Sequence, residues 1–103
     1  MELARVEGKI VSTAKQDKLR GYKLLLLNLV GPDAKPTENY IVAVDTVGAG
    51  PGEIVIAVRG SSARQAEGLS DVPSDTSIVA IVDTVERNGE TLYNKNLPEP
   101  ESV

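Results

Sequence analysis

The sequence contains no cysteine, no histidine, no phenylalanine and no tryptophan. Without cysteine the chain can form neither a disulfide nor a thiolate metal site. Without histidine it lacks the commonest catalytic base and the commonest metal ligand. Three tyrosines are the only aromatic residues, so the core must consist mainly of valine, isoleucine and leucine. These absences argue against histidine-based catalysis and against most kinds of metal site.

Acidic residues outnumber basic ones by 15 to 11, which gives a net charge of −4. Nucleic-acid binding requires clustered lysine and arginine, so this balance argues against it. The N-terminus has no secretory-signal pattern, and the longest apolar stretch is far shorter than a bilayer span. We therefore expect a cytoplasmic protein that binds neither nucleic acid nor membrane. A length of 103 residues predicts a single domain.

The central stretch, residues 41–58, organises the chain. Two apolar runs rich in β-branched residues, 41–47 and 54–58, flank a connector with three glycines and a proline. Valine and isoleucine favour strands, whereas glycine permits positive φ and proline removes a donor, so we predict strand, tight loop, strand. The candidate site is this loop together with the acidic residue before it: Asp45, Gly48, Ala49, Gly50, Pro51, Gly52 and Glu53.

A glycine-rich loop can cradle phosphate, but such loops lead directly into a helix, and one class also needs a lysine followed by serine or threonine. Here a strand follows, and the nearest charge is that of Glu53. We therefore interpret the loop as a structural turn or a subunit contact. Asp45 is expected to accept hydrogen bonds from the backbone amides of residues 48–50.

The rest of the chain has the pattern of an all-β protein. A short helix is predicted at 61–68 from a capping box and a terminal glycine, and Asn88-Gly89 predicts a tight hairpin. We predict a small OB-like closed β-barrel of about five to six strands with one short helix, spanning residues 1–96, and a flexible tail over 97–103. The expected strands are 3–13, 22–30, 41–47, 54–58, 78–85 and 90–94.

Four of these strands are apolar on both faces. In residues 22–30, Leu25 and Leu27 share one face, and Leu24 and Leu26 share the other. A monomeric barrel needs only its inner face to be apolar, and one short helix cannot cover four outer faces. We therefore predict an obligate homo-oligomer, although the pattern does not indicate which leucine face meets the neighbour.

The phrase Val-Asp-Thr-Val occurs twice, at 44–47 and at 82–85. It is similar to the Asp-Thr-Gly turn of homodimeric aspartic proteases, in which each subunit supplies one carboxylate. That turn needs glycine directly after threonine, whereas Val47 and Val85 stand there. The protease interpretation is therefore disfavoured, and so is a small OB-type ligand or nucleic-acid binder, because stacking aromatics are missing.

Five stretches of the sequence form a distinctive combination: 8–13 with Lys15, 21–26, 44–53, 60–64 and 79–83. Together they resemble the CcmL/EutN family, the pentameric vertex proteins of bacterial microcompartment shells. Within the family, residues 19–27 and 92–95 are most similar to carboxysome members, and ethanolamine- or propanediol-type relatives would share most of the rest.

The resemblance implies a structural role without catalytic residues, cofactors or metal. Homopentamers would occupy the vertices of an icosahedral shell in the cytoplasm and contact its hexameric shell proteins. In a carboxysome the shell would enclose carbonic anhydrase and the carbon-fixing carboxylase. The loop over residues 48–52 would then lie at a subunit contact near the five-fold axis.

Overall fold

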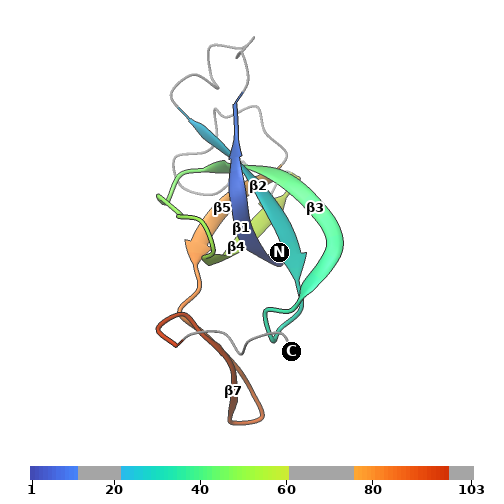
Figure 1. Ribbon diagram of the computed structural model, residues 1–103, viewed down its shortest axis with the longest axis vertical. Helices are drawn as coiled ribbons and strands as arrows, with labels where there is room; N and C mark the ends of the chain where they lie inside the picture. The colour runs from blue at the N-terminus through green and yellow to red at the C-terminus, as the bar shows by residue number, and fades with distance from the viewer. Residues whose placement is uncertain (12–21, 61–75, 98–103) are drawn as a thin grey trace.

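A computed structural model gives the structure of the protein, and it describes residues 1–11, 22–60 and 76–97 (Figure 1). The described residues form strands joined by turns and short connections, which confirms the all-β prediction. The strands are β1 (Glu2–Ile10), β2 (Lys23–Val30), β3 (Pro36–Asp45), β4 (Ile54–Arg59), β5 (Thr76–Ile81), β6 (Thr84–Arg87) and β7 (Glu90–Asn94).

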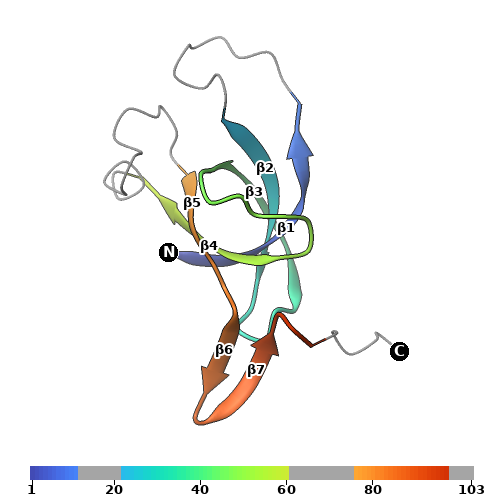
Figure 2. The same cartoon turned by 90° about the vertical axis from the view of Figure 1, so that its left-hand side faces the viewer.

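Five strands close into a barrel in the order β1-β2-β3-β5-β4, and β4 pairs back with β1. β3 and β5 run parallel, and the other neighbouring strands of the barrel are antiparallel. The predicted small closed barrel is therefore confirmed. The remaining two strands form a hairpin that extends from one end of the barrel (Figure 2).

The prediction of one strand over 78–85 was wrong. β5 ends at Ile81 and β6 begins at Thr84, so the run is divided between the barrel and the hairpin. At the break, the backbone N–H of Val82 donates to the carbonyl of Ile54 (2.8 Å), and the N–H of Lys95 donates to the carbonyl of Asp83 (2.9 Å). These bonds satisfy backbone groups where the chain changes sheet.

β3 begins at Pro36, well before the predicted start at residue 41. Its first residues are polar and exposed, so no apolar alternation indicated a strand there. A register shift lies between Asn28 and Val30 of the β2–β3 ladder. The Asn28 side-chain amide donates to the carbonyls of Thr37 (2.9 Å) and Asn39 (3.1 Å), which holds the irregular segment against β2.

The barrel core is aliphatic, as the composition required. It is formed by alternate residues of the strands, whose side chains point to the same face, and by Ala49 of the glycine-rich loop. On β2, Leu25 and Leu27 are buried in this core, whereas Leu24 and Leu26 lie on the opposite face and are partly exposed. The buried members of the core are Ala4, Val6, Leu25, Leu27, Ala43, Ala49, Val55, Ala57 and Ile78.

A second apolar cluster lies outside the barrel core. Buried Ile54 of β4 packs there with Ala34 and Val82, and the hairpin adds Val85 and Tyr93. The outer face of β4 is thus covered by the same chain. From the sequence, only the short helix was considered as a cover for the outer faces, and the packing of the hairpin on β4 was not anticipated.

The turn at Asn88-Gly89 joins β6 to β7 as predicted, with φ angles of 53° and 81°. Positive φ at both central residues is the mark of a type I′ turn, whose twist matches that of the strands. The predicted helix at 61–68 lies outside the described residues, as does the tail beyond Leu97, which is itself exposed. Within the described ranges, no helix is long and apolar enough to cross a membrane.

Candidate functional site

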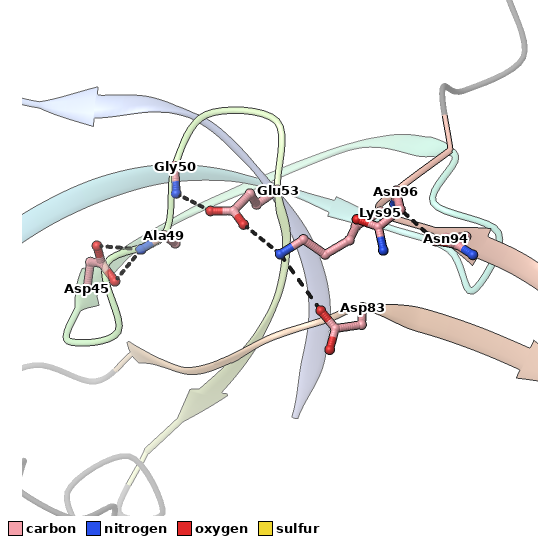
Figure 3. Close-up of polar contacts among 8 residues, drawn as sticks. All are labelled: Asp45, Ala49, Gly50, Glu53, Asp83, Asn94, Lys95 and Asn96. Atoms are coloured by element: carbon pink, nitrogen blue, oxygen red, sulfur yellow. Dashed lines mark hydrogen bonds and ion pairs between the residues drawn. The ribbon is translucent and has the colours of Figure 1, made fainter.

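Asp45 ends β3 and is the internal anchor of the glycine-rich loop. The residue is 7% exposed. Oδ1 accepts from the backbone N–H groups of Val47 and Gly48, both at 3.1 Å, and Oδ2 accepts from the N–H of Ala49 at 3.1 Å. Figure 3 shows the carboxylate facing the Ala49 amide. The prediction that Asp45 accepts hydrogen bonds from loop amides is confirmed, but the donors are the amides of residues 47–49 rather than 48–50.

The Gly50 amide is instead bound by Glu53. Its N–H donates to Oε1 of Glu53 at 2.5 Å, and the other carboxylate oxygen lies 3.4 Å from Nζ of Lys95 (Figure 3). The hydrogen bond from Gly50 lowers the pKa of Glu53 below its ordinary value of 4.5, and Lys95 lowers it further, although desolvation acts in the opposite direction. The ionised carboxylate of Glu53 is therefore the form that accepts the hydrogen bond from Gly50 and holds the two ends of the loop together.

Lys95 connects the loop to the hairpin. Its ammonium group also lies 3.7 Å from Oδ1 of Asp83, which is largely exposed. Lys95 follows β7, so one cation joins two segments far apart in the chain (Figure 3). Sequence reasoning missed this residue, because no local pattern signals a contact across 42 positions.

The loop backbone is held against β1. The N–H of Gly52 donates to the Val6 carbonyl (2.8 Å), and the N–H of Val6 donates to the Glu53 carbonyl (2.9 Å). Gly48 and Gly52 have φ angles of 76° and 84°, in the left-handed region that favours glycine. Gly50 is not among the residues with positive φ, so a left-handed backbone conformation does not explain the glycine at this position.

The predicted site residues divide into two groups. Asp45 and Ala49 are buried and maintain the fold. Gly48, Pro51 and Gly52 are exposed, while Gly50 and Glu53 are partly exposed. The exposed tip is thus available to a partner, whereas the anchoring groups are not. A role for the loop at a subunit contact stays a prediction.

The two copies of Val-Asp-Thr-Val have different surroundings. The first aspartate, Asp45, is buried and engaged by backbone amides, and the second, Asp83, is exposed beside Lys95. This arrangement does not favour a carboxylate pair that shares a proton, as the protease interpretation requires. Over residues 1–11, 22–60 and 76–97 there is also no group of three or more acidic, histidine or cysteine residues that could hold a metal ion.

Comparison with known proteins connects this geometry to a family. The family model described as "Ethanolamine utilisation protein EutN/carboxysome" matches residues 1–83. The carboxysome shell vertex protein CcmL of Thermosynechococcus vestitus is 47% identical over 95 residues, which cover 92% of this chain and 96% of that protein.

Solved structures agree with the sequence comparison. The structure of CcmL from Gloeobacter violaceus matches with a TM-score of 0.86 at 42% identity, covering 93% of this chain and 99% of that one. The pentameric microcompartment shell protein GrpN from Rhodospirillum rubrum matches with a TM-score of 0.76 at 48% identity, covering 84% of this chain and 99% of that one. The chain therefore belongs to the EutN/CcmL family.

Proposed function

We propose that this protein is a vertex protein of a bacterial microcompartment shell, located in the cytoplasm and assembled as a homopentamer. The observation that carries the proposal is 47% identity, over nearly the whole of both chains, to a carboxysome shell vertex protein. The pentameric state of GrpN supports five-fold assembly. A cyclic contact between unlike patches closes into a ring when the rotation per subunit permits it.

The protein would act by its shape and its five-fold symmetry and not by catalysing a reaction. Hexameric shell proteins tile a flat layer, and closing that layer into a shell requires five-fold points. A compact barrel whose loops are held by internal hydrogen bonds is suited to this role, because it offers fixed surfaces to its neighbours. The hexameric shell proteins are thus the expected partners, and the protein itself would catalyse no reaction.

We favour the carboxysome because three carboxysome vertex proteins are 46–47% identical over 92% of this chain, whereas the match to GrpN, at 49% identity, covers 84% of it. A metabolosome of the ethanolamine or propanediol type is the second candidate. The EutN protein of Escherichia coli supports it, with 41% identity over 92% of this chain. The two candidates share the assembly and differ in the enclosed enzymes.

The direct test is the mass of the assembled protein. Light scattering or native mass spectrometry at micromolar concentration should find five copies of the 10.9 kDa chain, about 55 kDa. Shells formed from hexameric shell proteins should close into polyhedra in electron micrographs only when this protein is added. A protein that stays monomeric at all concentrations would remove the proposal.

A further inference from the structure

The hairpin of β6 and β7 is a separate unit of the fold. The described strands form two sheets, and none of the five barrel strands pairs with β6 or β7. Residues 82 and 83 connect β5 to β6, and the hairpin extends from that end of the barrel (Figure 2). A two-stranded hairpin is at best marginally stable by itself. The hairpin therefore depends on its side-chain contacts with the barrel.

The first of these contacts is apolar. Val85 and Tyr93 of the hairpin pack against the cluster that contains Ile54 and Val82. Both hairpin side chains are only partly buried, so the apolar contact is modest. The hydrogen bond from the Val82 N–H to the Ile54 carbonyl (2.8 Å) fixes the point at which the chain leaves the barrel. These contacts secure the base of the hairpin.

The second contact is ionic and lies where β7 ends. Nζ of Lys95 is 3.4 Å from Oε2 of Glu53 and 3.7 Å from Oδ1 of Asp83 (Figure 3). Asp83 belongs to the connection before β6, so its contact with Lys95 stays within the base of the hairpin. The contact with Glu53 instead joins the end of the hairpin to the glycine-rich loop. The side chains of Lys95 and Glu53 are 34% and 28% exposed, so solvent screens this ion pair only in part.

The Glu53 carboxylate takes part in two contacts at once. Oε1 accepts the hydrogen bond from the Gly50 N–H, and Oε2 faces Lys95. If Lys95 moves away, the Glu53 side chain gains rotamer freedom and its bond to Gly50 weakens. Because such coupling is reciprocal, a looser loop must also weaken the hold on the hairpin. Glu53 therefore links the order of the loop to the position of the hairpin.

We infer that the hairpin is a hinged flap, with residues 82 and 83 as the hinge and the Lys95–Glu53 ion pair as the latch, and that its opening loosens the glycine-rich loop. Opening would uncover Ile54 while the barrel ladders stay intact. A molecule that binds the open hairpin would thereby change the surface that the loop presents. This inference concerns the single subunit and does not rest on the proposed pentameric function.

Hydrogen–deuterium exchange of the assembled wild-type protein tests whether the hairpin opens as a unit. Peptides that cover residues 82–97, 46–53 and 23–30 report on the hairpin, the loop and the barrel strand β2. We expect the hairpin amides to exchange about tenfold or more faster than those of β2, and with a weaker dependence on denaturant. Equal rates with equal denaturant dependence would show that the hairpin opens only when the barrel unfolds, which overturns the inference.

Lys95→Met tests the latch, because it removes the charge and keeps an apolar stem. Loss of a partly exposed ion pair should speed exchange about two- to fivefold, in the hairpin peptide and in the loop peptide. Glu53→Gln breaks the same pair but leaves an oxygen that can accept from Gly50, so it should speed the hairpin by a similar factor. The double variant should exchange no faster than the faster single variant, because one interaction is lost in all three.

Arg59→Met is the matched control. Nε of Arg59 lies 2.7 Å from Oε2 of Glu2, and this ion pair joins β4 to β1 within the barrel. Its loss should leave hairpin exchange unchanged, and an equal acceleration there would show a general loss of stability and overturn the latch. Unchanged hairpin exchange in Lys95→Met also overturns it, and a faster hairpin with an unchanged loop overturns the coupling. The mass of the assembly tests the proposed function separately, so either idea can fail alone.

Discussion

The two faces of β2 have similar sequences and opposite environments. Leu25 and Leu27 point into the barrel and are 5% and 0% exposed, whereas Leu24 and Leu26 point outward and are only partly covered. The difference teaches that an apolar side chain by itself does not indicate where it is buried. The inner leucines hold the subunit together, and the outer ones are available for assembly.

The largest expected effect is that of Leu25→Asp. This change places a carboxylate in the aliphatic core, where no group can pair with it, and should cost about 3 kcal/mol or more of unfolding free energy. The purified variant should be largely unfolded by circular dichroism. Its control, Leu26→Asp, lies on the next residue but faces outward, so it should fold and fail to assemble. Equal loss of folding in both variants would contradict the assignment of faces.

A smaller effect is expected for Asp45→Ala, which removes the polar anchor of the loop. Three backbone amides would lose a charged acceptor, so we expect a loss of about 1.5–3 kcal/mol. Asp83→Ala is the matched control in the second copy of the same phrase, and it should change stability by less than about 0.5 kcal/mol. Chemical denaturation measures both, and similar losses would show that the repeated phrase acts alike in both places.

Gly52→Ala should cost about 1–2 kcal/mol, since residue 52 has a φ angle of 84°, which L-residues rarely adopt. Gly50→Ala should cost less, because its φ is not positive and the added Cβ would meet only the flexible Glu53 side chain, at 3.3 Å. Thermal unfolding of the two variants compares them. A more severe effect at Gly50 would indicate that contact with the Glu53 carboxylate controls the loop.

The smallest expected effect concerns the pH dependence of stability. The pKa of Glu53 is lower in the folded state than its ordinary value of 4.5. Its ionised form therefore contributes stability above 4.5, and this contribution is lost as the pH falls through the folded pKa. Glu53→Gln should reduce the slope of stability against pH in that acidic range and leave the slope near neutral pH unchanged. An unchanged acidic slope would mean that the bond to Gly50 does not favour the anion.

The sequence was most informative where local chemistry decides the structure. Asn88-Gly89 predicted a hairpin because a type I′ turn needs positive φ at both positions. Asp45 was expected to accept hydrogen bonds from nearby amides because the short aspartate side chain commonly bonds the backbone a few residues ahead. The sequence was least informative where the residues in contact are far apart in the chain. Lys95 bridges Glu53 and Asp83, and no pattern near residue 95 indicates either partner.

The sequence by itself determined an aliphatic β-barrel and a glycine-rich connector, because composition, alternation and turn chemistry act over a few residues. It also identified the family, because long phrases were present in order. Only the tertiary structure decided which leucine face of β2 lies inside and that the hairpin covers β4. Those choices depend on strand register and on the closure of the barrel, which bring together side chains that are far apart in the chain.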